Sequence, residues 1–153
     1  MKRALLFATL LTALNLSAQD KKEAAVQQAI DQFFEGYHTR DTSMMRAVLG
    51  PGALLQSVGQ DQEGVPRLQT EDLGNFLKKV ASIPDTVQLQ EKLLDYRIQL
   101  DGNMAHAWTP YHFYLHNAFH HCGVNSFQLF NDGSSWKIIY IVDTRRTNDC
   151  RED

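Results

Sequence analysis

The stretch "GVNSFQLFNDGSSWKIIYIVDTRR", from Gly123 to Arg146, decides the fold class. Alternating apolar and polar residues on both sides of Asp132-Gly133 predict two antiparallel strands joined by a tight turn. A second Asp-Gly, at residues 101–102, joins "LLDYRIQL" (93–100) to "MAHAWTPYHFY" (104–114) in the same way. Asp-Gly suits a type I′ turn, because both central residues of that turn need positive φ. The sequence therefore predicts a sheet of four long antiparallel strands in this half of the chain.

The register of these strands follows if each Asp-Gly forms a two-residue turn. The connection between the two hairpins, around Asn117, is longer, and we set its register by keeping the faces consistent. The pairs expected to face each other are Ile98 and Ala105, Tyr96 and Ala107, Leu129 and Trp136, Phe127 and Ile138, Phe113 and His121, and Tyr111 and Gly123.

This register assigns every residue of the four strands to one of two faces. The face expected to receive the helices has no Asp or Glu; it consists of Leu94, Tyr96, Ile98, Ala105, Ala107, Thr109, Tyr111, Phe113, His121, Asn125, Phe127, Leu129, Trp136, Ile138, Tyr140 and Val142. The opposite face is mixed, but part of it is too apolar for plain exposure to solvent. Its apolar residues include Trp108, Ile139 and Ile141, beside His112, His120 and Cys122.

The first half of the chain predicts helices that can cover this sheet. Residues 21–39 place apolar side chains at helical spacing, which indicates one amphipathic helix. A short second helix is expected from Thr42 to Leu49, with Asp41 as its N-cap rather than a catalytic base. A short strand is expected from Ala53, and a third helix within residues 70–84, capped by Thr70. Helices followed by an antiparallel sheet define an α+β fold.

The N-terminus predicts export. Residues 1–18 combine Lys2 and Arg3, an apolar run and small residues at the expected cleavage point after Ala18, which is typical of a secretory signal peptide. Cleavage changes the formal net charge from -3 to -5 and leaves one domain, residues 19–153. The acidic balance argues against nucleic-acid binding, and no second apolar stretch is long enough for membrane insertion. We therefore expect a periplasmic or secreted protein.

The sequence contains two cysteines, Cys122 and Cys150. An even count in an oxidising compartment favours one disulfide between them, and two free thiols are the alternative.

Three stretches resemble the nuclear transport factor 2-like superfamily, and specifically its secreted bacterial lumazine-binding (SnoaL-like) branch. They are "AIDQFFEGYHTRDTSMMRAVL", "LDGNMAHAWTPYHFYL" and "HHCGVNSFQLFNDGSSWKIIYIVDTR". The resemblance spans roughly residues 24–146 and implies a cone-shaped barrel: a curved, mostly antiparallel sheet wrapped around three N-terminal helices, with a pocket between them. It also implies homodimers formed through the outer sheet face. The superfamily contains both enzymes and pure binding domains, so the fold alone names no reaction.

Within such a cone the inward residues predict an aromatic-lined pocket for an unknown small molecule. Its expected lining is Tyr37, Tyr96, Thr109, Tyr111, Phe113, His121, Asn125, Phe127, Trp136 and Tyr140. If the protein is an enzyme, His121 and Tyr111 are the candidate acid–base pair, with Asn125 beside them. No cofactor is predicted.

Two further surfaces follow from the opposite face. One possibility is a zinc site, because one or two rungs of the sheet contain His112, His120 and Cys122. The remaining candidate for a fourth ligand is His116. A disulfide would remove the sulfur and a tetrahedral zinc site needs four ligands, so we predict no metal site. Trp108, Ile139 and Ile141 are the candidates for a homodimer interface.

Three functions remain open on this reasoning. The leading prediction is a small-ligand-binding domain without catalysis. The alternatives are a small-molecule enzyme of the dehydratase, isomerase or hydrolase type, and a dimeric protein-interaction module.

Overall fold

The computed structural model describes the backbone of residues 2–150 and the side chains of residues 19–150. Its elements confirm the α+β class. In chain order they are α1 (Lys2–Thr39), α2 (Thr42–Val48), β1 (Leu49–Gln60), β2 (Pro66–Glu71), α3 (Leu73–Ala81), β3 (Leu89–Leu93), β4 (Arg97–Asp101), β5 (Met104–Leu115), β6 (Ala118–Asn131) and β7 (Trp136–Arg146).

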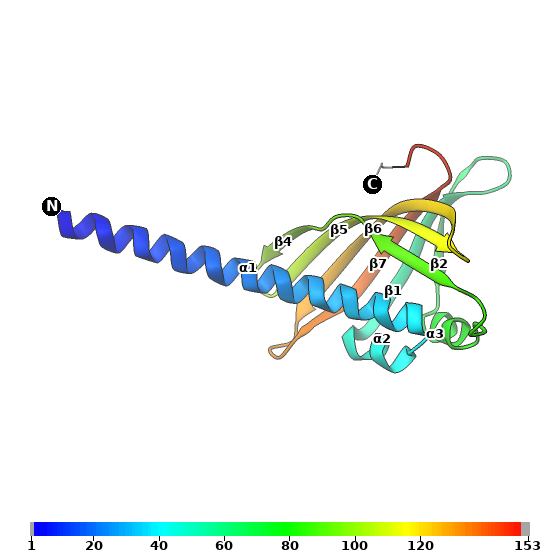
Figure 1. The fold of residues 1–153 in the computed structure, drawn as a ribbon, viewed down its shortest axis with the longest axis horizontal. Coiled ribbons are helices and arrows are strands. Elements are labelled where there is room, and N and C mark those ends of the chain that lie inside the picture. Colours follow the sequence, from blue (N-terminus) through cyan, green and yellow to red (C-terminus); the bar gives the residue numbers. More distant parts are fainter. Residues whose placement is uncertain (1, 151–153) are drawn as a thin grey trace.

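The strands form a single curved sheet that wraps around the helices without closing (Figure 1). Its order is β2-β1-β7-β6-β5-β3, and β4 also pairs with β5. All neighbours are antiparallel except β1 and β7, which are parallel. The C-terminal half of α1 crosses the concave face, and α2 and α3 lie near its C-terminal end (Figure 1). This is the cone that the sequence predicts.

The core lies between α1 and the concave face of the sheet. Val26, Ile30, Phe33 and Phe34 recur at helical spacing along α1 and are buried. The ring of Phe34 meets that of Phe127 on β6 edge to face, with centroids 6.1 Å apart. Burying each such side chain stabilises the fold by roughly 1.5–3 kcal/mol, so this contact holds the helix in the cone.

Two helix starts are set by aspartates. The Asp41 side chain accepts hydrogen bonds from the backbone N–H groups of Ser43 and Met44, each at 3.0 Å, which confirms it as the N-cap of α2. Asp72 caps α3 by accepting from Asn75 N–H at 2.8 Å. The prediction that Thr70 caps α3 is wrong, because Thr70 belongs to β2 and pairs with Gln56.

The register is confirmed in the middle hairpin and shifted by two residues in the other two. In the last hairpin Trp136 faces Asn131 instead of Leu129, and Ile138 faces Leu129 instead of Phe127. Phe113 faces His121 and Tyr111 faces Gly123, as predicted. Between β4 and β5 the turn residues are Gly102 and Asn103, so Ile98 faces Ala107 instead of Ala105. This shift of two residues leaves every side chain on its predicted face, because side chains alternate with a period of two.

The faces predicted for β7 are wrong beyond Ile138. A β-bulge lies between β6 and β7, where Leu129 pairs with Ile138 but Gln128 pairs with Tyr140. The extra residue, Ile139, reverses the alternation that follows. Ile141 and Asp143 therefore point into the cone, while Tyr140 and Val142 point outward. The neighbouring strand β1 is irregular at the same level, between Leu49 and Leu54.

A disulfide joins Cys122 on β6 to Cys150, which follows β7. Cys122 is buried on the outer face, directly opposite His112 of β5. The cysteine pairing expected from the sequence is thus present in the structure.

The predicted signal peptide, residues 1–18, coincides with the first part of α1, and its side chains lie outside the described residues. Within the described part of the chain, no helix is both long and apolar enough to span a membrane.

Removing the disulfide tests its contribution to stability. Cys150→Ala should lower the free energy of unfolding by about 3–4 kcal/mol, because the bridge restricts the unfolded chain across a separation of 28 residues. Cys122 stays in place in this variant, so its buried site is not emptied. Urea denaturation of both proteins measures the difference, and a change below about 1 kcal/mol would contradict the prediction.

Candidate functional site

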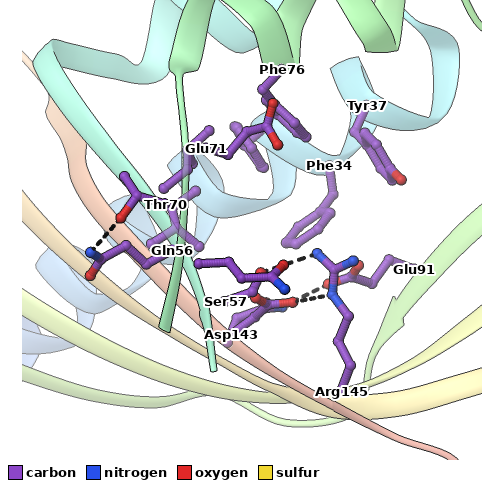
Figure 2. A pocket seen from close by; sticks show the side chains of 15 residues that line it. Phe34, Tyr37, Gln56, Ser57, Thr70, Glu71, Phe76, Glu91, Asp143 and Arg145 are labelled. Carbon is purple, nitrogen blue, oxygen red and sulfur yellow. Dashed lines mark hydrogen bonds and ion pairs between the residues drawn. The ribbon is translucent and has the colours of Figure 1, made fainter. Parts of the chain in front are cut away.

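A cavity of about 270 Å³ opens inside the cone, toward the end where α1 meets α3. Helices α1 and α3, the β1–β2 hairpin, β3, β6 and β7 all contribute to its wall. The apolar part of that wall is Phe33, Phe34, Leu55, Phe76 and Ile141. Figure 2 shows these rings and a set of polar side chains around the same space.

Two aromatic rings from different helices line one side of the cavity. Tyr37 of α1 stacks on Phe76 of α3, with ring centroids 6.4 Å apart and planes inclined by 15°. Burial raises the pKa of Tyr37 to about 12, and the nearby Glu91 adds to this effect. The phenol therefore stays protonated at neutral pH and can donate a hydrogen bond into the cavity.

Glu91 supplies a carboxyl group from β3. It lies opposite Phe113 in the sheet, so its side chain shares the inner face of β5. Its Oε1 accepts a hydrogen bond from Nδ2 of the buried Asn125 at 2.7 Å. Its backbone N–H donates to Nε2 of His38 at 2.9 Å, and burial lowers the pKa of His38, which keeps Nε2 able to accept.

The surroundings of Glu91 favour its neutral form. The pKa of Glu91 is raised from 4.5 to about 7, chiefly by burial and to a smaller extent by the negative charge of Asp143. The hydrogen bond from Asn125 and the charge of Arg145 act in the opposite direction but are weaker than burial. Burial is therefore the dominant influence, and it favours the protonated form of Glu91.

An ion pair on β7 completes the polar wall. Arg145 Nε lies 2.7 Å from Oδ2 of the buried Asp143, and Arg145 Nη2 donates to Ser57 Oγ of β1 at 3.4 Å (Figure 2). Asp143 pairs with Asn125 across β6 and β7. Glu91, Asn125 and Asp143 thus form a row across three strands at the floor of the cavity.

The structure brings two of the predicted pocket residues, Tyr37 and Asn125, to this cavity. The other predicted residues lie elsewhere. Thr109 and Phe127 are fully buried, and Trp136 packs into the core from the start of β7. Tyr96 donates its hydroxyl hydrogen to Asp31 of α1.

Tyr140 lies on the outer face, where its hydroxyl donates to Gln56. It was expected in the pocket, and the bulge at Ile139 is the reason for the difference.

The predicted acid–base pair, His121 and Tyr111, forms a ring cluster outside the cavity lining. His121 stacks on Phe113 with centroids 4.9 Å apart and meets Tyr111 edge to face at 5.7 Å. The Tyr111 hydroxyl donates to the backbone oxygen of Thr144 at 3.0 Å, so its hydrogen is engaged. Burial, followed by Arg145 and His120, lowers the pKa of His121 to about 4. Such a histidine is a weak base at neutral pH.

The residues weighed for a metal are only partly together. His112 lies directly opposite Cys122, but the Cys122 sulfur belongs to the disulfide. His120 Nδ1 lies 2.8 Å from Nδ1 of His121, and His116 sits in the β5–β6 turn. No group of three or more His, Cys, Asp or Glu side chains able to hold a metal occurs among the described residues.

The outer-face candidates separate in the structure. Trp108 is 42% exposed on the outer face of β5. Ile141 lines the cavity, so its assignment to the interface is wrong. Ile139 occupies the bulge, and its Cγ2 is so near Gly50 of β1 that a Cβ atom there would come within 2.8 Å. Glycine at position 50 lets the side chain of Ile139 pack against the strand.

The polar lining residues that the sequence reasoning missed include Glu91, Asp143 and Arg145. The alternation Leu89, Glu91, Leu93 could have placed Glu91 on an inner face, because residues two apart share one side of a strand. Asp143 and Arg145 had no such signal. They follow the apolar run 138–142, which has no polar residues to show which side chains face inward. The bulge that turns Asp143 and Arg145 inward lies within that run.

Comparison with known proteins bears on this geometry. A scan of protein-family models and a search of curated proteins give no match. Solved structures do match across most of the chain. A nuclear transport factor 2 (NTF2)-like protein of unknown function from Shewanella baltica has a TM-score of 0.60 at 12% identity, covering 84% of this chain and 96% of that one.

Two further neighbours are described by activity. A candidate dehydratase of the NTF2-like family from Streptomyces avermitilis has a TM-score of 0.64 at 14% identity, covering 84% of this chain and 98% of that one. The beta subunit of a candidate aromatic-ring-hydroxylating dioxygenase from Novosphingobium aromaticivorans has a TM-score of 0.67 at 11% identity. The match covers 85% of this chain and 92% of that one. At these identities the likeness shows the fold. The chain therefore has the NTF2-like fold.

The raised pKa of Glu91 predicts a pH-dependent stability. The folded protein binds a proton more tightly than the unfolded chain, so stability is lost as pH rises from about 4.5 to about 7. Glu91→Gln removes this loss. Between pH 4 and pH 8 the variant should gain on the order of 3 kcal/mol relative to the parent, from a pKa that moves from 4.5 to about 7.

Urea denaturation at the two pH values measures this difference. Glu63→Gln, at an exposed glutamate, is the control for loss of one carboxylate. Parallel pH profiles for the parent and Glu91→Gln would show that Glu91 is not desolvated.

Proposed function

We propose that this protein binds a small organic molecule in the cone cavity. A volume of about 270 Å³ is close to the lower end of ligand pockets, which begin near 300 Å³. Aromatic walls with a few convergent polar groups are the usual composition of such pockets. The occupant is therefore small and partly flat.

One observation supports this proposal above the others: Glu91 is a half-buried carboxyl group in the cavity wall that receives one side-chain hydrogen bond, from Asn125. Burying a carboxyl group without full compensation costs free energy, and a purely structural core would fill the same position with an apolar side chain. Asn125 and Tyr37, from two other elements, converge on the same space. Such an arrangement is the one expected where a ligand completes the hydrogen bonding.

A second candidate function is acid–base catalysis on a small molecule, with Glu91 in place of the His121–Tyr111 pair. A general acid or base works best when its pKa lies near the working pH, and the pKa of Glu91 is about 7. Tyr37 is a protonated donor lining the same cavity. Catalysis would require a substrate proton within hydrogen-bond reach of Glu91, and binding is the part of this function that the cavity supports directly.

Export and self-association complete the proposal. Residues 1–18 support cleavage of a signal peptide, and a disulfide is compatible with an oxidising compartment. Trp108 leaves a large apolar side chain 42% exposed on the outer face, which supports a homodimer formed there.

Filling the cavity tests the binding function. Ser57 lines the cavity, whereas its neighbour Val58 is exposed, so Ser57→Phe and Val58→Phe form a matched pair. In ligand-observed NMR with a set of small aromatic alcohols, amines and acids, the parent and Val58→Phe should bind members of the set. Ser57→Phe should lose this binding because the new ring occupies the space. Unchanged binding by Ser57→Phe would place the fragments elsewhere.

The proposed homodimer predicts a change in mass on disruption of the outer face. Trp108→Glu places a charge at an exposed apolar position and should shift sedimentation toward the monomer. Met104→Glu places the same charge at another exposed apolar residue of β5, nearer the end of the strand. It shows whether the effect is specific to position 108. Sedimentation of Trp108→Glu identical to that of the parent would count against this interface.

A further inference from the structure

We propose that the ligand of the cone cavity is an organic cation, a protonated amine or similar nitrogen base, whose charged group contacts Glu91 and the neighbouring aromatic rings. This inference rests on the proposed binding function and specifies the chemical class of the ligand. It follows from the charges and hydrogen bonds of the cavity wall.

Glu91 has an oxygen available to a ligand. Its Oε1 accepts from Asn125 at 2.7 Å. Among the described residues, no other side chain donates to the Glu91 carboxyl group. A ligand N–H group in the cavity can therefore donate to Oε2 without displacing a protein contact. A charged donor makes the stronger hydrogen bond to a carboxylate.

The charges of the wall leave Glu91 without a cation of its own. In the described residues lining the cavity, Arg145 is the only cation, and it lies 2.7 Å from Asp143. Glu71 lies in the wall as well, but Lys79 pairs with it at 2.9 Å. Among the described residues, Glu91 is thus the carboxyl group of the wall without an ion-pair partner, and the charge of Arg145, which is paired with Asp143, also acts on it. A ligand cation would supply this partner.

Aromatic rings surround the same space. Tyr37 and Phe76 stack side by side, and Phe34 lies between them and the carboxyl groups in the view of Figure 2. An ammonium group over such a ring gains about 0.5–2 kcal/mol from the ring's negative face. A carboxylate in the same place gains nothing from the rings and is repelled by Asp143 and Glu91, while Arg145, the cation of the wall, already pairs with Asp143 at 2.7 Å. The site therefore selects for positive charge.

The titratable groups around Glu91 come from several elements. Tyr37 and His38 of α1, Tyr111 of β5, and Asp143 and Arg145 of β7 influence it or are influenced by it. Burial holds the pKa of Glu91 at about 7, so part of the population is protonated when the cavity is empty. An adjacent cation favours the ionised form, and binding should release a proton near neutral pH.

Three probes of one shape separate the ligand classes: benzylamine, benzyl alcohol and benzoate, measured by isothermal titration calorimetry at pH 7. We expect benzylamine to bind at least tenfold more tightly than benzyl alcohol, and benzoate to bind most weakly. Titration in phosphate and in Tris, which differ in ionisation enthalpy, should show release of a fraction of a proton with benzylamine alone.

Two variants identify the responsible carboxyl group. Glu91→Gln should lose both the tenfold preference for benzylamine and the proton release, because the carboxylate that contacts the ammonium group is replaced by a neutral amide. Glu71→Gln removes a carboxylate of the same wall that already has Lys79 as a partner, and it should keep both properties. Equal loss in the two variants would overturn the role of Glu91.

The outcomes also distinguish this inference from the proposed binding function. Benzyl alcohol or benzoate binding as tightly as benzylamine would overturn the cation, while the cavity would remain a binding site. Failure of all three probes, together with no difference between Ser57→Phe and Val58→Phe in the fragment set, would overturn both.

Discussion

The structure depends on the packing of α1 across the concave face of the sheet. The apolar stripe of this helix, which includes Ile30 and Phe34, meets Phe127 and Ile138 inside the cone. Burying these side chains, at roughly 1.5–3 kcal/mol each, holds the helix against the concave face of the sheet. Beyond Phe34 the stripe continues to Tyr37, where helix and sheet diverge and the cavity begins. The same helix thus closes the core at one end and lines the site at the other.

The chemistry of the cavity depends on one irregularity of the sheet. The extra residue at Ile139 moves Ile141, Asp143 and Arg145 from the outer face to the inner face. Without this bulge, Asp143 would point to solvent and Asn125 would have no charged neighbour on β7. Because bulges reverse the phase of everything that follows, one residue decides the electrostatics of the site.

The polar floor is held together across strands that are distant in sequence. Glu91 on β3 contacts Asn125 on β6, and Asn125 lies opposite Asp143 on β7. Asn125 and Asp143 are buried and Glu91 is half-buried, so each is sensitive to the charge of the others in a medium of low polarity. Asp143 and Arg145 act on the pKa of Glu91 in opposite directions, and burial keeps it raised to about 7. A ligand that enters this cavity meets a surface whose charge responds to it.

The sequence by itself determined the α+β class, the helix that begins at Asp41, the middle hairpin and the pairing of Cys122 with Cys150. Each of these follows from a local signal: a capping aspartate, alternation of side chains, or an even number of cysteines. Only the tertiary structure decided that Glu91 and Asp143 face the cavity and that Ile141 does not belong to an interface. The run 138–142 is apolar throughout, so the sequence does not show which of its side chains face inward. Pairing of the strand with β1 and β6 decides this. The site could not be predicted because the position of a bulge is set by contacts with neighbouring strands, which the order of residues along one strand does not contain.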